Sequence, residues 1–177
     1  MKKLTKLAAA ALTGVALLIG SNVNAQTTPS SAFRFGLGLE LGAPTGNASN
    51  FSSFALGGTA RLQYGVTNDL ALTLTSGYYS LFGKNYTVGN TTIDGPNVGI
   101  VPLKAGIKAF FAESLYFGAE VGAGFETSAG GSTKFIASPA LGWANKTWDV
   151  SARYENFAGQ NNNYGLVGLR IAYGFEL

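Results

Sequence analysis

The side chains that could do chemistry in this sequence are mostly carboxylates and basic groups, because the chain contains no histidine and no cysteine. Ser–His and Cys–His nucleophile pairs are therefore excluded, as are metal sites built on imidazole or thiolate ligands. Glu120 and Glu126 could in principle act as a general acid and base. Asp94 is the only acid in the segment 83–98, which is too few for a calcium site. The sequence thus predicts a protein that is not an enzyme and that uses no cofactor or metal.

The charged residues follow a local pattern. Along most of the chain, bulky apolar residues take every second position, and charged residues take the positions between them, together with Gly, Ala, Ser and Thr. A period of two is typical of β-strands, whose successive side chains point to opposite faces. Twelve charged residues, six basic and six acidic, lie on the small-residue face: Arg34, Glu40, Arg61, Lys104, Lys108, Glu120, Glu126, Asp149, Arg153, Glu155, Arg170 and Glu176.

The alternation recurs in eight segments, which we expect to be strands. They lie at 33–42, 54–66, 70–78, 101–111, 115–126, 135–144, 148–155 and 167–177. Their connections alternate between long loops (43–52, 83–98, 127–133 and 158–163) and tight turns (67–69, 112–114 and 145–147). An even number of antiparallel strands with long loops at one end and short turns at the other is typical of transmembrane β-barrels.

The composition of the two faces distinguishes a membrane barrel from a soluble one. A soluble barrel buries its bulky apolar residues and covers its outside with charged side chains, which usually make up about 25–35% of a surface. In this sequence the face without bulky residues is mostly Gly, Ala, Ser and Thr, and no charge falls on the apolar face. Because a basic side chain facing mid-bilayer costs about 2–4 kcal/mol, we predict that the apolar face contacts lipid. The predicted fold is all-β: an eight-stranded antiparallel up-and-down transmembrane β-barrel.

The N-terminal residues have the features of a cleavable signal peptide. Lys2, Lys3 and Lys6 precede an apolar run at 7–19, and Val23-Asn24-Ala25 supplies small residues for cleavage. The run is shorter than the roughly 20 residues that a membrane-spanning helix needs. We therefore expect a signal peptide at 1–25, a short linker at 26–31 and the barrel at 32–177. Without its three leader lysines, the chain has nine residues of each charge, so no nucleic-acid partner is predicted.

The last strand carries a further pattern. Leu177, Phe175 and Tyr173 alternate with small or charged residues down to Arg170. Over 32–177 the chain resembles the OmpA/OmpX-type superfamily of small eight-stranded outer-membrane barrels. Its end is similar to their C-terminal assembly signal, carried here by Arg170, Tyr173, Phe175 and Leu177, with Ala172 where glycine is usual. The resemblance implies a monomer in the bacterial outer membrane, contact with its lipid and lipopolysaccharide, and recognition by the barrel-assembly machinery.

Three alternative functions can be distinguished by how the lumen is filled. Equal numbers of basic and acidic lumen residues predict mutual pairing, and an eight-stranded barrel is only wide enough for side chains to fill it. We therefore expect a structural or surface-interaction protein, with possible ligands bound by the long loops. The alternative is a narrow channel for ions or very small solutes, through pockets left by lumen glycines: Gly36, Gly38, Gly57, Gly106, Gly118, Gly122, Gly124 and Gly168. A carrier of hydrophobic ligands would need an apolar lumen, which the charges argue against.

Overall fold

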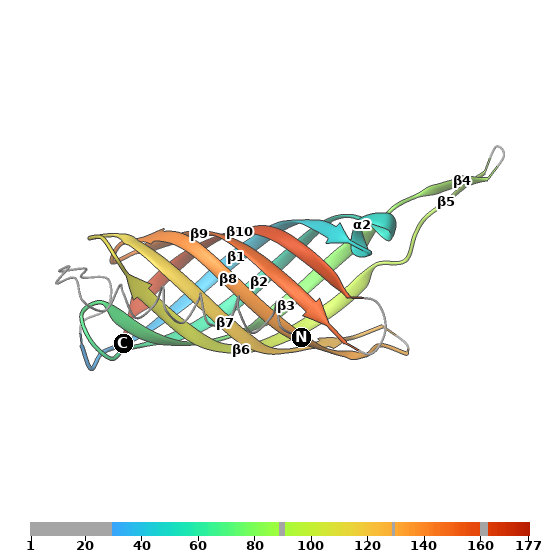
Figure 1. The fold of residues 1–177 in the computed structure, drawn as a ribbon. Helices are drawn as coiled ribbons and strands as arrows, with labels where there is room; N and C mark the ends of the chain where they lie inside the picture. Colours follow the sequence, from blue (N-terminus) through green and yellow to red (C-terminus); the bar gives the residue numbers. More distant parts are fainter. Residues whose placement is uncertain (1–29, 89–90, 129, 160–162) are drawn as a thin grey trace, which may run out of the picture.

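The computed structural model describes residues 30–88, 91–128, 130–159 and 163–177. Eight long antiparallel strands close into a barrel in the order β1-β10-β9-β8-β7-β6-β3-β2 (Figure 1). The predicted eight-stranded up-and-down barrel is confirmed. Its strands are β1 (Phe33–Gly46), β2 (Ser52–Gly65), β3 (Leu70–Gly83), β6 (Val98–Phe110), β7 (Leu115–Glu126), β8 (Thr133–Ala144), β9 (Trp148–Ala158) and β10 (Tyr164–Glu176).

Some expectations concern residues outside these ranges. The proposed signal peptide at 1–25 lies outside the described residues, as does most of the proposed linker at 26–31. Within the described ranges, no helix is long and apolar enough to cross a bilayer.

Several strands are longer than the hydrophobic alternation predicts. The loop expected at 43–52 is shorter, because β1 runs to Gly46 and a four-residue helix, α2 (Ala48–Phe51), leads directly into β2. The alternation ends earlier than the strand because only the part within hydrocarbon needs bulky side chains outside. Backbone pairing continues beyond that point, from Leu41↔Leu169 to Gly46↔Tyr164.

The segment expected to be the longest loop forms a second small sheet. Strands β4 (Tyr86–Val88) and β5 (Thr91–Ile93) pair as an antiparallel hairpin between β3 and β6. The hairpin projects from the barrel at the end that carries α2 (Figure 1). We call this end the loop end, and the opposite end, with the connections at 66–69, 111–114 and 145–147, the turn end.

Pairing of the first and last barrel strands closes the structure. Their register is unbroken from Arg34↔Glu176 at the turn end to Gly46↔Tyr164 at the loop end. Since every barrel strand thus has two neighbours, no strand edge is left open, which is the condition for a β-structure to span a hydrocarbon layer.

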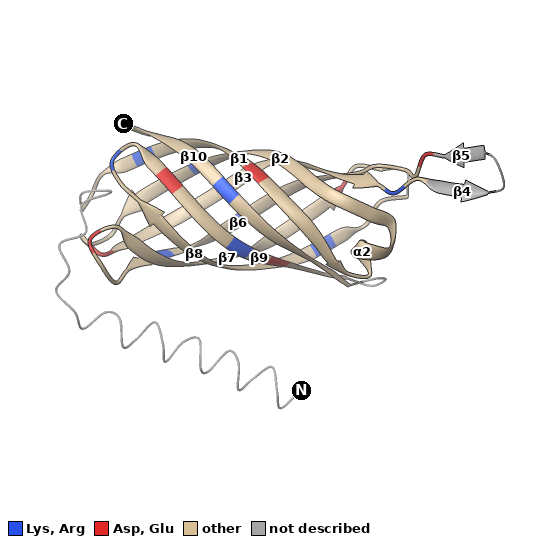
Figure 2. Cartoon of the chain, turned by 90° about the horizontal axis from the view of Figure 1, so that it is seen from above, with Lys and Arg blue, Asp and Glu red and all other residues tan. Residues whose placement is uncertain are grey.

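The outside of the barrel is an apolar belt. Leu39 is 66% exposed and Val121 is 54% exposed, and neighbouring strands contribute many further exposed bulky apolar side chains. The charged residues of the barrel strands, coloured on the ribbon in Figure 2, all fall on the other phase of the alternation, and most of them are buried. A contiguous apolar surface of this kind is rare on soluble monomers and marks a surface that contacts membrane or a partner. The belt therefore has the composition of a lipid-facing surface.

Aromatic side chains pair on the belt near both ends of the strands. At the turn end, Phe33 packs on Tyr64 with 4.8 Å between ring centroids, and Trp148 contacts Tyr173 edge-on at 5.4 Å. At the loop end, Phe54 stacks on Phe82 at 4.5 Å. Aromatic rings are favoured at the two headgroup levels of a bilayer, so these pairs mark where the barrel would meet the membrane interfaces.

The substitution Leu39→Arg tests whether the apolar belt contacts lipid. Leu39 lies midway along β1, so we expect its replacement by arginine to lower the free energy of unfolding by about 2–4 kcal/mol, measured by urea titration in lipid vesicles. The control is Phe33→Arg at the end of the same strand, where the expected loss is only about 0–1 kcal/mol. Equal losses at the two positions would contradict a lipid-facing belt.

Candidate functional site

The lumen contains a network of nine charged side chains, and none of these side chains is more than 10% exposed. The alternation of each strand directs them inward, and the closed barrel brings strands from distant parts of the sequence around one axis. Five are basic and four are acidic: Arg61, Lys104, Lys108, Arg153, Arg170, Glu40, Glu120, Asp149 and Glu155.

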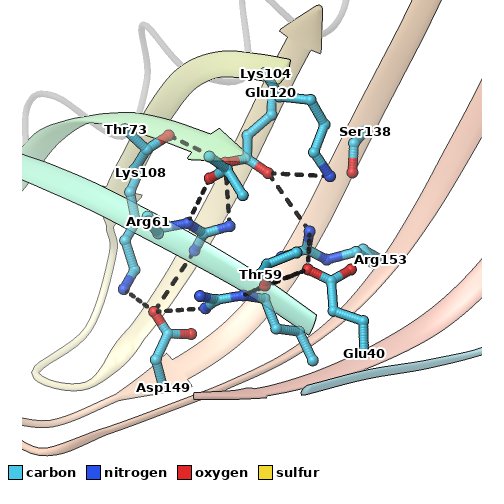
Figure 3. Close-up of polar contacts among 12 residues, drawn as sticks. Glu40, Thr59, Arg61, Thr73, Lys104, Lys108, Glu120, Ser138, Asp149 and Arg153 are labelled. Atoms are coloured by element: carbon cyan, nitrogen blue, oxygen red, sulfur yellow. Dashed lines mark hydrogen bonds and ion pairs between the residues drawn. The ribbon is translucent and has the colours of Figure 1, made fainter. Parts of the chain in front are cut away.

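Six members of the network form a closed ring in which cations and carboxylates alternate. Distances between neighbouring nitrogen and oxygen atoms range from 3.1 Å for Arg61–Glu120 to 3.9 Å for Arg170–Asp149. Figure 3 shows Arg61 between two carboxylates and Arg153 between Glu120 and Glu40. In order, the ring is Arg61, Glu120, Arg153, Glu40, Arg170 and Asp149.

The other three members attach to this ring. Lys108 donates to Asp149 at 2.6 Å. Lys104 pairs with Glu155 and lies 3.8 Å from Glu120, and Glu155 in turn lies 3.6 Å from Arg153. Each of these nine charges therefore has at least one opposite charge within 4 Å, which is what burial of ionised groups requires.

Uncharged hydroxyl groups complete the network. Thr75 donates to Glu120 at 2.6 Å and accepts from Arg61 at 3.0 Å. Thr59 links Glu40 and Arg170 in the same way, at 3.0 and 3.2 Å. Hydroxyls of Tyr79, Thr73, Tyr116 and Ser138 also contact the carboxylates. All eight barrel strands thus contribute a polar side chain to the network.

Three of the twelve predicted lumen residues lie apart from this network. Arg34 is buried near the turn end and donates to the carbonyl oxygen of Asn145 at 2.7 Å. Glu126 lies at the loop end, where it accepts from Tyr164 at 3.1 Å and from Ser132 at 3.0 Å. Glu176 is exposed at the end of β10, so the structure does not place it in the lumen network.

The sequence analysis missed one buried cation and all the hydroxyl partners. Lys134 is only 3% exposed and its ammonium lies 5.9 Å above the ring of Tyr164. It falls between the loop expected at 127–133 and the strand expected from Phe135, whereas β8 begins at Thr133. Its position next to outward-facing Phe135 could have identified it. The hydroxyls were treated only as small residues of the lumen face.

Glycines in the lumen accommodate large neighbours. A Cβ atom on Gly57 would lie 2.2 Å from the ring of Tyr79, and one on Gly142 would lie 2.4 Å from the ring of Tyr116. In both cases the glycine faces the tyrosine directly across a strand pair. At these positions the tyrosine rings occupy the space beside glycine. The idea that Gly57 leaves an open pocket is therefore wrong.

An apolar plug fills the loop-end part of the lumen, which the sequence analysis did not foresee. It consists of lumen-face side chains of the strands together with Ala48 and Phe51 of α2. Its members are Ala48, Ala55, Tyr79, Leu81, Ile100, Ile136, Phe157, Tyr164 and Leu166, with Phe51 and Val98 packed against them. Below it, two cavities lined by network residues have volumes of only about 10 and 20 Å³, each about large enough for a single water molecule. A third cavity, of about 190 Å³, lies at the loop end beside Leu81, Glu126 and Tyr164.

The geometry does not favour acid–base chemistry by Glu120 and Glu126. The two residues are six positions apart on β7, which corresponds to roughly 20 Å along a strand. Glu120 contacts three cations, whereas Glu126 contacts only neutral groups in the bonds described above. Among the described residues there is no group of three or more potential ligands that could hold a metal ion.

The fold and the filled lumen define a class: small transmembrane β-barrels. No family model and no curated protein matches the sequence. Among solved structures, the chain is similar to Ail, the attachment invasion locus protein of Yersinia pestis, with a TM-score of 0.58 and 14% identity, covering 82% of this chain and 99% of that one. A structure of Ail in a phospholipid bilayer nanodisc gives a TM-score of 0.54 at 15% identity, covering 79% and 99%.

Two further solved structures are also similar to this chain. Ail in complex with the heparin analogue sucrose octasulfate matches with a TM-score of 0.55 at 14% identity, covering 82% of this chain and 99% of that one. The de novo designed protein TMB2.3 matches with a TM-score of 0.51 at 13% identity, covering 84% and 96%. At these identities the likeness defines the fold: the chain has the fold of small β-barrels of the bacterial outer membrane.

Proposed function

We propose that the chain is a non-enzymatic integral protein of the bacterial outer membrane, with a closed lumen and a structural or surface-interaction role. The observation that carries this proposal is the filling of the lumen. A ring of ion pairs crosses it, and the apolar plug lies between that ring and the loop end. The cavities that the network residues line have volumes of only about 10 and 20 Å³, and each is too small for a hydrated ion. A channel is therefore the less favoured function.

A surface-interaction role would require the loop end to bind a partner. Here α2, the hairpin β4–β5 and the cavity of about 190 Å³ lie on the side away from the tight turns. Lys84 holds the base of the hairpin against α2 by donating to the carbonyl oxygen of Ser49 at 2.6 Å. Such structured protrusions offer a preformed binding surface, which lowers the entropic cost of binding.

The charge of the loop end bears on the class of partner. Among the described residues of this end, the basic ones are Lys84 and the buried Lys134, and the acidic ones are Asp94 and Glu126, so the surface carries no cluster of basic side chains. Sulfated sugars such as the analogue bound by Ail are polyanions, which are normally recognised by clusters of basic side chains. The balanced charge supports a neutral or polar partner for this chain. We further propose a monomer that contacts lipid and lipopolysaccharide and is inserted by the barrel-assembly machinery.

Planar-bilayer recording tests the closed lumen. We expect no discrete conductance steps from the folded protein, because the ring Arg61–Glu120–Arg153 and the plug obstruct the axis. Folding should be verified before reconstitution by the resistance of the unboiled protein to sodium dodecyl sulfate. The absence of conductance then reflects a closed barrel and not an unfolded protein. Discrete steps that change on Arg61→Gln or Glu120→Gln would establish the channel function instead.

A further inference from the structure

A small cavity on the turn-end side of the ion-pair ring is lined by an unusual set of residues. It has a volume of about 20 Å³ and is bordered by three arginines but only one acidic residue, Asp149. The three arginines are nearly inaccessible, with exposed fractions of 5%, 6% and 1% for Arg34, Arg61 and Arg170. Positive charge is thus concentrated around a space that solvent hardly reaches.

The charges of the network do not cancel. Five cations face four carboxylates in the network, which leaves a formal excess of one positive charge, and Arg34, which lies opposite Glu176 across the β1–β10 seam, borders the cavity on the same side. Uncompensated charge in a protein interior is strongly unfavourable. One small anion in this cavity would reduce the excess by one charge.

The single carboxylate beside the cavity is already occupied by other donors. Asp149 accepts from Lys108 and from Tyr116, each at 2.6 Å. The guanidinium nitrogens of Arg61 and Arg170 stay 3.7 and 3.9 Å from it, which is beyond hydrogen-bond distance. Asp149 therefore does not satisfy the hydrogen-bonding capacity of the two arginines.

Arg170 retains an unused donor. Its Nη2 atom is buried and has no hydrogen-bond partner within the protein, although Arg170 as a whole is only 1% exposed and borders the cavity. A buried donor without a partner destabilises the fold, and more so when the group is charged. This donor, the charge excess and the cavity are separate observations that indicate the same ligand.

We propose that the cavity binds one small monovalent anion, such as chloride, held by the guanidinium groups of Arg34, Arg61 and Arg170. Its volume admits a ligand of about the size of one water molecule, which excludes phosphate, sulfate and sugar acids. The anion offsets excess charge inside the barrel and gives Arg170 an acceptor. This lumen anion site goes beyond the proposed surface role and does not depend on it.

Gly36→Ala is the matched test, because Gly36 lines the cavity. A Cβ atom there meets nothing nearer than the carbonyl oxygen of Tyr173 at 3.5 Å, so the methyl group fits the backbone but occupies space that the anion needs. The control is Gly58→Ala, the same change on the lipid face of β2, where a Cβ atom has no neighbour within 4 Å.

Urea unfolding in micelles should be compared in sodium chloride and in sodium gluconate at equal ionic strength, since gluconate is too large for the cavity. With chloride at ten times its dissociation constant, we expect the unfolding equilibrium constant of the wild type to be about elevenfold lower than in gluconate. Gly58→Ala should respond like the wild type, and Gly36→Ala should not respond. Equal unfolding of the wild type in both salts, or an undiminished response of Gly36→Ala, would overturn the proposal.

A second measurement covers the case in which Gly36→Ala does not fold. Crystals of the wild type grown in sodium bromide should show an anomalous diffraction peak between Arg61 and Arg170. A water molecule at that position, with no bromide peak, would refute the anion site.

Discussion

Deletion of Phe175, Glu176 and Leu177 is expected to abolish insertion of the protein into the outer membrane. These residues form the turn-end part of the seam that closes the barrel. Glu176 and Phe175 pair with Arg34 and Phe35 across that seam, and the amide of Leu177 donates to the carbonyl oxygen of Phe33 at 3.2 Å. Without them, backbone groups of β1 would be left unpaired at the membrane, at a cost of several kcal/mol each.

The same deletion removes two residues of the proposed assembly signal, so two variants are needed to separate the causes. Replacing Phe175 and Leu177 together by alanine keeps the backbone pairs but removes the side chains, including the packing of Phe175 on Tyr173 at 4.9 Å. Loss of insertion in cells with normal refolding in micelles would support recognition of these side chains. Glu176→Gln, at an exposed position, should insert normally.

Membrane fractionation and protease accessibility of cells that express each variant provide the measurement. The full-length protein should fractionate with the outer membrane. Its recovery as a soluble periplasmic protein would contradict the proposed location, and normal insertion of the truncated protein would show that the assembly-signal hypothesis is wrong.

Glu120→Gln is expected to be the most destabilising single substitution in the lumen. Its carboxylate lies within 4 Å of Arg61, Lys104 and Arg153 and also accepts hydrogen bonds from Thr73 and Thr75. The amide keeps the shape but leaves five buried cations with three carboxylates. Since removing one partner of a buried ion pair typically costs about 3–5 kcal/mol, we expect a loss of that size in the free energy of unfolding.

Urea titration in micelles measures this loss, with Glu113→Gln as the control. Glu113 is an exposed residue of a turn-end connection, where the same change should matter by no more than about 0.5 kcal/mol. The double variant Arg61→Gln/Glu120→Gln restores the wild-type excess of one positive charge, so it should be more stable than the sum of the single losses predicts. Strict additivity, or a loss for Glu120→Gln as small as that of the control, would mean that the network is not coupled.

Much of the architecture could be predicted from the alternation alone. Because side chains alternate with a period of two, the sequence indicates which residues share a face of each strand. The absence of charge from one face indicates which face contacts lipid. Leu39 and Val121 on the outside, and Arg61 and Glu120 on the inside, follow from these two observations. The number of strands and the alternation of long and short connections could also be predicted, because both are local features of the sequence.

The ends of the strands could not be predicted as well. Hydrophobic alternation reports only the part of a strand within lipid, whereas β1 and β8 extend beyond it by backbone pairing. Lys134 lies in the extension of β8, and most of the apolar plug lies in α2 and in the corresponding extensions of β3, β6, β9 and β10. The contribution of Phe157 and Leu166 to the core therefore could not be predicted from the hydrophobic alternation.

The pairing of charges across the lumen depends on the tertiary structure. Glu40 and Arg153 are 113 residues apart, and Arg61 and Glu120 are 59 apart. The sequence determined that each points into the barrel, because the side-chain period is a property of the single strand. Which charges meet across the lumen depends on the register, tilt and closure of all eight strands together. The uncancelled charge beside Arg170 emerges only at that level.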